Sequence, residues 1–141
     1  MADLKVVTFL GIHVDLPSPH PQVALREVAS PWRELRIEVA YPEAISISRA
    51  WKRIPSVRPL SHDIWCEMLT KLNVTLEVVR ITRQEHGVFY SEMEFMTRDG
   101  NLIIDCRPSD AFAMALRQNL TVPILVGDDI FPVSPSSNRS E

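Results

Sequence analysis

The sequence predicts a single α+β domain with about three helices and six or seven strands in mixed or antiparallel β-sheets. Three observations support this class. The 141 residues suit one domain, strand-like and helix-like hydrophobic periods follow one another, and short turns join consecutive strand-like segments. We expect the domain to span residues 1–133, and the polar segment 134–141, which lacks an apolar anchor, to be a disordered tail.

The N-terminal part is predicted to contain three strands. Residues 4–14 are apolar enough for the first strand, and three prolines make residues 15–21 a loop. Residues 23–28 and 35–39 follow as a strand pair with a turn at 29–31, and the second strand alternates apolar with charged side chains.

Two helices are expected next. Pro42 stands at the start of the first helix, where its missing N–H costs least, and two prolines in residues 54–60 end this helix. Its apolar face holds Ala44, Ile47, Ser48 and Trp51. The second helix is predicted to begin with Ser61 as N-cap and Asp63 in the first turn. Its apolar stripe consists of Ile64, Trp65, Met68, Leu69 and Leu72.

The C-terminal part is predicted to contain an antiparallel meander, a helix and a final strand. The hydrophobic period changes to two after residue 73. The meander strands are residues 74–83, 88–97 and 102–106, with turns near His86-Gly87 and at Asp99-Gly100. The helix from Pro108 to about Asn119 is apolar nearly all round and should be the most buried helix. Residues 122–126 form the last strand.

Composition limits the classes of partner and compartment. The net charge of −3 argues against nucleic acid as an obvious partner, because phosphate binding usually shows as a basic surplus, although it leaves room for a local basic groove. No apolar run approaches the ~18 residues that span a bilayer, and no apolar leader precedes residue 4. We therefore expect a cytoplasmic protein without membrane contact, in which Cys66 and Cys106 are reduced thiols.

A polar motif, Asp105-Cys106-Arg107-Pro108-Ser109-Asp110, separates two apolar segments where a strand ends and a helix begins. The structural interpretation is a capped helix start in which Arg107 pairs with Asp105 or Asp110. The functional interpretation is an anion site at a helix N-terminus, where an arginine binds phosphate in two-point fashion. Nearby carboxylates then hold Mg²⁺ or Mn²⁺, which prefer oxygen ligands.

A second motif, Arg58-Pro59-Leu60-Ser61-His62-Asp63, has the same order of arginine, proline, hydroxyl group and acid at a helix start. The imidazole of His62 makes it a candidate general base or acid. The alternative is an exposed histidine in a first helical turn with no special role.

The two motifs, RPLSHD at 58–63 and IDCRPSDA at 104–111, together resemble the bifunctional nuclease domain family, also described as DNase-RNase domains. The similarity extends over about residues 23–133. Glu43-Ala44 matches a short Glu-Ala element of the family, and Phe89-Tyr90 matches its Phe-Tyr-Ala strand. This resemblance implies an α+β domain, frequently oligomeric, that acts as a nuclease on DNA and RNA.

Five features depart from the family pattern. Residues 35–40 replace a Leu-Pro-Ile-Trp-Ile-Gly-like strand, so a groove shaped by that strand would differ here. Ser61 stands where threonine is usual, and Ser91 and Cys106 stand where alanine is usual. The last helix reads Ala-Phe-Ala-Met-Ala, where the family tends to Ala-Ile-Ala-Leu-Ala.

The first functional hypothesis is a nuclease that hydrolyses phosphodiester bonds of DNA and RNA with Mg²⁺ or Mn²⁺. Such hydrolysis needs an activated water and charge neutralisation at phosphate. The catalytic candidates are His62, Asp63, Asp105 and Asp110, with Glu43 as a further metal or water ligand, and the substrate-binding candidates are Arg58, Arg107 and Ser109. The hypothesis requires the two motifs to lie within about 10 Å, with at least one carboxylate open to solvent.

Two other functions stay open. One is a non-enzymatic, oligomeric regulatory or interaction module, most simply a dimer, in which the Arg-Pro motifs are ion-pair corners. Trp32 and Trp51 would then mark an interface, where aromatic residues are enriched, unless they pack in the core. The other is binding of a small anion or nucleotide at the Pro108 helix start, without turnover.

Overall fold

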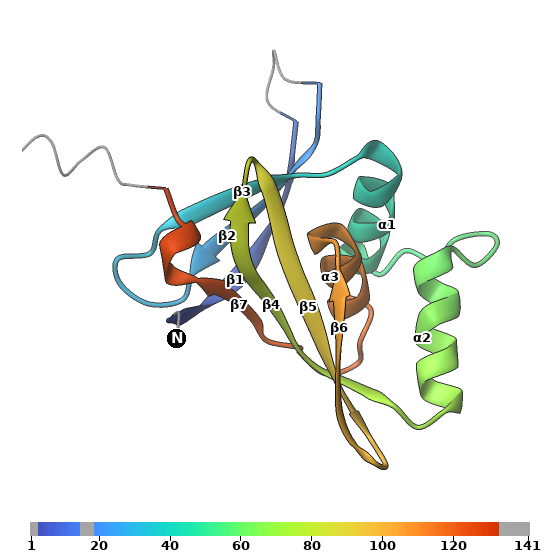
Figure 1. The fold of residues 1–141 in the computed structure, drawn as a ribbon. Helices are drawn as coiled ribbons and strands as arrows, with labels where there is room; N and C mark the ends of the chain where they lie inside the picture. The colour runs from blue at the N-terminus through green and yellow to red at the C-terminus, as the bar shows by residue number, and fades with distance from the viewer. Residues whose placement is uncertain (1–2, 15–18, 133–141) are drawn as a thin grey trace, which may run out of the picture.

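The computed structural model describes residues 3–14 and 19–132, which form one mixed seven-stranded sheet and three α-helices (Figure 1). The strands are β1 (Leu4–His13), β2 (Gln22–Glu27), β3 (Glu34–Glu38), β4 (Thr75–Glu85), β5 (Val88–Thr97), β6 (Gly100–Cys106) and β7 (Ile124–Gly127). The helices are α1 (Tyr41–Lys52), α2 (Ser61–Lys71), α3 (Pro108–Ala115) and the short 3-10 helix η1 (Asp128–Ile130). The α+β class is confirmed. The predicted tail at 134–141 lies outside the described residues, as does part of the loop at 15–21.

The strand order is β3-β2-β1-β7-β4-β5-β6, so β7 joins the N-terminal strands to the C-terminal meander. All neighbouring strands are antiparallel except β4 and β7, which run parallel with Val79 opposite Ile124. The predicted meander is confirmed by the continuous β4–β5 and β5–β6 pairing. Strand ends differ from the predicted ends by one or two residues at most. β3 and β6 are the two edge strands of this sheet.

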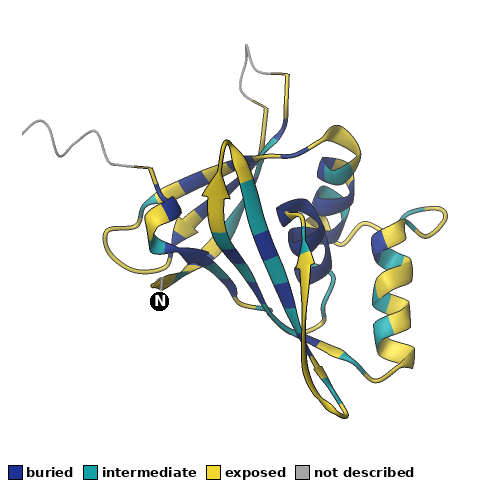
Figure 2. Cartoon of the chain, viewed as in Figure 1, coloured by how far each residue is buried: buried dark blue, intermediate teal, exposed yellow. Residues whose placement is uncertain are grey.

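Helix α3 lies at the centre of the core, as its nearly continuous apolar sequence predicts. All eight of its residues are buried between the sheet and α1 (Figure 2). Phe112 is fully buried and stands beside β1, with its ring 6.4 Å from that of Phe9. Truncating such a side chain to alanine costs about 3–5 kcal/mol. This core fixes the N-terminus of α3, which carries the polar motif of residues 105–110.

Helix α3 is shorter than predicted, because it ends at Ala115 rather than near Asn119. Two side chains from the following residues satisfy its last carbonyl groups. Arg117 Nη1 donates to the Ala113 carbonyl at 3.0 Å, and Gln118 Nε2 donates to the Met114 carbonyl at 2.8 Å. The polar residues that looked like a last helical turn therefore serve as its C-terminal cap.

Helix α2 begins where predicted, but its cap differs from the expected Ser61. Leu60 is the N-cap residue and Ser61 is the first helical residue, without a side-chain capping bond. Asp63 reaches back instead, and its Oδ2 accepts a hydrogen bond from the Leu60 N–H at 2.8 Å. A carboxylate in the first turn also meets the positive end of the helix dipole.

The apolar stripe of α2 is largely uncovered, since four of its five members are exposed, namely Ile64, Trp65, Met68 and Leu72. Neither Trp32 nor Trp51 is a buried core residue, because both are exposed, although the Trp51 ring packs edge-on against Phe9 at 5.3 Å. No helix among the described residues is long and apolar enough to cross a membrane.

Candidate functional site

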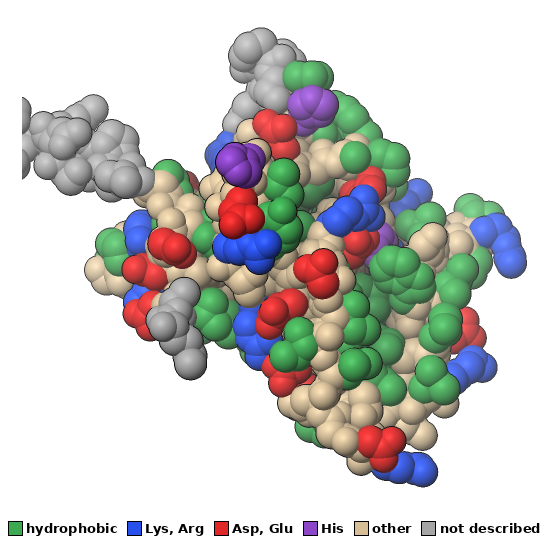
Figure 3. Space-filling view, viewed as in Figure 1, with side chains coloured by type: hydrophobic (Ala, Val, Ile, Leu, Met, Phe, Trp, Pro, Cys, Tyr) green, Lys and Arg blue, Asp and Glu red, His purple; other side chains and the backbone are tan. Residues whose placement is uncertain are grey.

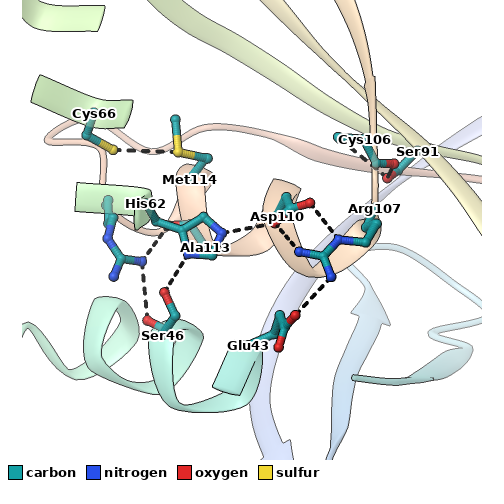
Figure 4. Close-up of polar contacts among 11 residues, drawn as sticks. Glu43, Ser46, His62, Cys66, Ser91, Cys106, Arg107, Asp110, Ala113 and Met114 are labelled. Atoms are coloured by element: carbon teal, nitrogen blue, oxygen red, sulfur yellow. Dashed lines mark hydrogen bonds and ion pairs between the residues drawn. The ribbon is translucent and has the colours of Figure 1, made fainter. Parts of the chain in front are cut away.

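The first turns of all three helices meet at one cluster of polar side chains (Figure 4). Helix α1 supplies Glu43 and Ser46, α2 supplies His62, and the start of α3 supplies Arg107 and Asp110. The Nε2 atom of His62 lies 3.0 Å from Oδ1 of Asp110. The expected convergence of the two sequence motifs within about 10 Å is thereby confirmed at these two residues.

Ser46, His62 and Asp110 form a continuous hydrogen-bonded chain. Ser46 Oγ lies 2.7 Å from His62 Nδ1, and the other ring nitrogen faces Asp110. An ionised carboxylate only accepts hydrogen bonds, so the proton of a neutral His62 lies on Nε2. Its Nδ1 then accepts the hydrogen bond from the Ser46 hydroxyl. This order of hydroxyl, imidazole and carboxylate is that of an activated hydroxyl group.

Arg107 is the N-cap residue of α3 and holds both carboxylates of the cluster. Its Nε and Nη2 donate to the two oxygens of Asp110 at 2.9 and 2.8 Å, and its Nη1 donates to Glu43 Oε1 at 2.9 Å. The bonds to Asp110, followed by the bond to Glu43, raise the pKa of Arg107 above its already high value. Its side chain is 63% exposed. Three of the five guanidinium N–H groups are used, which leaves two for a ligand.

The charge of Asp110 is stabilised despite its burial. Burial opposes the ionised form, but hydrogen bonds from Arg107 and His62 outweigh it and hold the pKa of Asp110 below its ordinary value.

Glu43 is different, because its Oε2 is buried and has no hydrogen-bond partner among the described residues. Such an atom is costly unless a ligand or a water molecule pairs with it.

These groups line a pocket of about 320 Å³, formed by Pro42, Glu43, Ser46, Leu60, Ser61, His62, Trp65, Arg107 and Asp110. The rings of Trp65 and His62 meet edge to face at 5.0 Å, which makes Trp65 one wall of the pocket. The pocket is therefore polar at its base and aromatic on one side, with the exposed arginine at its mouth.

Asp63 belongs to a separate ion pair behind this pocket. Its Oδ1 accepts a hydrogen bond from Arg117 Nε at 2.8 Å. Burial opposes ionisation of Asp63, but the bonds from Arg117 and from the Leu60 N–H lower its pKa. Arg117 also donates to the Ser46 carbonyl at 3.2 Å, so it links Asp63 to the cluster. The side chain of Asp63 is 37% exposed. At least one carboxylate of the two motifs is thus open to solvent, as the nuclease hypothesis requires.

Three predicted residues stand outside the cluster. Arg58 is exposed in the loop before α2 and does not line the pocket. Asp105 is exposed at the end of β6, opposite Glu92 of β5, without a side-chain hydrogen bond to another described residue. Ser109 is buried and faces a neighbouring depression that Glu43 and Arg107 also line.

Ser46 and Arg117 were missed by sequence reasoning. Ser46 lies three residues after Glu43, so both project from the same side of α1, and this Glu-x-x-Ser spacing is the only local signal. Arg117 follows the last helix, and no pattern in the sequence identifies a partner 54 residues away.

The described residues do not form a ready-made Mg²⁺ or Mn²⁺ site. No group of three or more His, Cys, Asp and Glu within residues 3–14 and 19–132 is placed to hold a metal ion. Both oxygens of Asp110 and of Asp63 already accept bonds from arginine, histidine or a backbone amide. Glu43 Oε2 is the one oxygen in the pocket that is buried and unpaired.

Comparison with known proteins gives the class of this protein. The family model described as "Bifunctional nuclease domain" matches residues 23–137, most of the chain. An uncharacterized protein of Mycobacterium tuberculosis is 35% identical over 130 residues, which are 92% of this chain and 74% of that protein. The chain belongs to the bifunctional nuclease domain family.

Relatives that carry the nuclease name are more distant. Bifunctional nuclease 1 of Arabidopsis thaliana is 25% identical over 118 residues, 81% of this chain and 36% of that protein. Bifunctional nuclease 1 of Oryza sativa subsp. japonica is 29% identical over 113 residues, 77% of this chain and 33% of that protein. The chain thus spans about a third of these plant relatives.

Proposed function

We propose that this protein is a nuclease that hydrolyses phosphodiester bonds of DNA and RNA in the pocket between α1, α2 and the start of α3. One observation carries the proposal. In a chain of the bifunctional nuclease domain family, a hydroxyl, an imidazole and a carboxylate are hydrogen-bonded in series beside an arginine with free N–H groups.

The proposed reaction begins with a phosphate diester held by the two remaining N–H groups of Arg107. A planar guanidinium suits the oxygens of phosphate and counters the charge that develops there. A water molecule bound to Ser46 Oγ attacks phosphorus and gives its proton to Ser46, while the Ser46 proton moves to His62 Nδ1. Asp110 holds the His62 ring in place and stabilises the imidazolium that forms. The leaving oxygen takes a proton from solvent, and the imidazolium releases one proton to solvent, which restores neutral His62.

A second pocket, which is basic, extends the surface that would bind the nucleic acid backbone. It has a volume of about 220 Å³ and is lined by Arg49, Arg53 and Arg117, together with Asp63 and the loop before α2. Arg117 donates to the Ser46 carbonyl, so the two pockets adjoin. Such a local basic region attracts phosphate despite the net charge of −3.

A non-enzymatic module is the second candidate, and the completeness of the ion pairs favours it. Arg107, Asp110 and His62 satisfy one another, Asp63 and Arg117 do the same, and these contacts join three helices. Charges paired in this way need no substrate to explain them. Under this account Arg107→Ala unfolds the domain and no nuclease activity is found.

The decisive experiment uses the purified chain and end-labelled single-stranded DNA and RNA oligonucleotides, with and without Mg²⁺ or Mn²⁺. We expect cleavage of both, and loss of cleavage in Ser46→Ala. The matched control is Ser48→Ala, two residues away on α1 and outside the pocket, which should cleave at the wild-type rate. Equal rates for both variants would remove Ser46 from the mechanism, and absence of cleavage by the wild type would favour the non-enzymatic module.

The cytoplasmic location and the use of Mg²⁺ or Mn²⁺ remain predictions. We propose a cytoplasmic location, in keeping with two free thiols. Burial raises the pKa of both Cys66 and Cys106, so their reactive thiolate forms are disfavoured.

A further inference from the structure

An apolar groove between α2 and the sheet adjoins the polar pocket. Its volume is about 350 Å³, and most of the side chains that line it are apolar. Figure 3 shows hydrophobic side chains gathered over α2 and β6 in this part of the molecule. A concave, mostly apolar cavity of this size with a few polar groups at its border is the usual form of a site for a small molecule or for part of a larger ligand.

The two walls of the groove come from different parts of the chain. One wall is the apolar stripe of α2, which contributes Trp65 and Met68. The other is formed by β5 and β6, where Ile104 stands opposite Met93, so that both side chains point to the same face of the sheet. Met114 of α3 also lines the groove. Methionine side chains are flexible and polarisable, so three of them can adapt to the surface of a flat ligand.

Trp65 joins the groove to the pocket that holds Arg107. It lines both cavities, as does Asp110. The rings of Trp65 and His62 are nearly perpendicular, at 84°, so His62 covers at most one face of the indole. Trp65 is also 40% exposed. An aromatic side chain thus stands accessible at the border of the two cavities, where it can stack with a flat ring.

We propose that the groove binds a nucleobase of the substrate, stacked on Trp65, while Arg107 binds the adjoining phosphate. This inference rests on the proposed nuclease function of the polar pocket. A nucleotide has the layout that the two cavities require, because one sugar joins its charged phosphate to its flat base. A purely aliphatic ligand would match the walls of the groove but would leave the exposed guanidinium beside it unused.

Stacking also agrees with a substrate range that includes both DNA and RNA. Every base has a π-face, so an aromatic platform tolerates any base. It contacts the base rather than the sugar, and the presence or absence of the 2′-hydroxyl therefore has little effect on it. The bound base must be unpaired, because a paired base lies inside the stack of its own duplex.

The first test is the NMR spectrum of the methionine methyl groups in a Ser46→Ala chain, in which a bound diester should stay intact. The probes are the adenine dinucleotides with deoxyribose and with ribose, and the same diester with an abasic sugar analogue in place of each nucleoside. The ring current of a bound base should shift the signals of Met68, Met93 and Met114, whereas the abasic diester should not. Met96 is the matched control, because it is 49% exposed, close to the 54% of Met68, and lies outside the groove.

The second test is the affinity of the same probes, measured by isothermal titration calorimetry in the same Ser46→Ala background. Trp65→Ala should weaken binding of both adenine dinucleotides by about 5- to 150-fold, the loss of one base–aromatic stack, and leave binding of the abasic diester unchanged. Trp65→Phe keeps an aromatic ring and should recover most of the affinity. Trp32→Ala is the matched control, since Trp32 is an exposed tryptophan outside both cavities, and it should bind all probes like its parent chain.

The outcomes separate the base site from the proposed activity. Equal affinity for the adenine and abasic diesters, or groove methyl signals that stay in place, would overturn the base site and leave phosphate binding by Arg107 intact. An equal loss for both kinds of probe in Trp65→Ala would mean that Trp65 shapes the pocket and does not stack. Binding of no probe would overturn both proposals, whereas shifted groove methyl signals in a protein without nuclease activity would support the base site alone.

Discussion

The Nε2 atom of His62 lies 3.0 Å from Oδ1 of Asp110, although 48 residues separate them in sequence. The first is in the opening turn of α2 and the second in the opening turn of α3. Both side chains are buried, with exposed fractions of 9% and 11%, so the contact is shielded from solvent. This pair determines which nitrogen of His62 faces Ser46, and the predictions about activity follow from it.

Asp110→Asn should lower the cleavage rate by at least about 10²-fold, because the amide no longer fixes the His62 tautomer or stabilises its charged form. The assay is single-turnover cleavage of labelled DNA and RNA, with circular dichroism to show that the variant is folded. Asp99→Asn, in the exposed β5–β6 turn, is the control of the same chemistry and should retain full activity. Full activity in a folded Asp110→Asn chain would exclude Asp110 from catalysis.

Arg107→Ala should weaken both substrate binding and the fold. It leaves Asp110 and Glu43 without their shared partner, and we expect a loss of about 1–3 kcal/mol of unfolding free energy, less than for a fully buried pair because the arginine is largely exposed. Arg107→Lys keeps the charge but not the two-point geometry, so it should recover stability better than substrate affinity. Urea denaturation and the KM for an oligonucleotide separate the two effects. Equal recovery of both by lysine would contradict two-point binding.

Acid should destabilise the protein through Asp110 and Asp63, whose pKa values are lowered in the fold. A lowered carboxyl pKa adds stability above the pKa of the unfolded chain, and this stability disappears as pH falls through the folded value. Unfolding free energy should therefore decline below about pH 4. Asp110→Asn should show a shallower decline than the wild type, measured by urea titrations at several pH values. Parallel curves would mean that Asp110 does not contribute.

Glu27 and Arg33 form another ion pair, in which the carboxylate is buried and which lies outside the pocket. Three hydrogen bonds from Arg33, two from its side chain and one from its backbone, lower the pKa of Glu27 to about 2. We expect Glu27→Gln to cost about 1.5–3 kcal/mol of stability and to leave the cleavage rate of the folded protein unchanged. A drop in cleavage at full folding would show that stability and catalysis are coupled across the sheet.

Removal of divalent metal tests the sequence-based expectation of Mg²⁺ or Mn²⁺. The described residues offer no preformed cage, so EDTA should leave the melting temperature unchanged. A lowered melting temperature would reveal a resident ion. Cleavage that stops in EDTA at an unchanged melting temperature would mean that the ion enters with the substrate phosphate, as is common for Mg²⁺.

The sequence was sufficient for the class of fold and for the places where α2 and α3 begin. Both helix starts carry prolines and acids whose local effects are strong. The sequence limited the partner of Arg107 to Asp105 or Asp110, and the structure selects Asp110, three positions further on in the first helical turn.

The partners of distant residues were not predictable. Ser46 lies outside the apolar face that periodicity identifies on α1, and only the approach of α2 to α1 brings His62 to its hydroxyl. Periodicity likewise shows that Trp65 and Met68 share a face of α2, but it carries no information on what covers that face.

The most direct test of the account is a double-mutant cycle on single-turnover cleavage with His62→Gln, Asp110→Asn and the double variant. If His62 and Asp110 act as one unit, each single change should slow cleavage and the double variant should be no slower than the slower single variant. Single variants as fast as the wild type, or losses that multiply in the double variant, would contradict the proposed role of this pair.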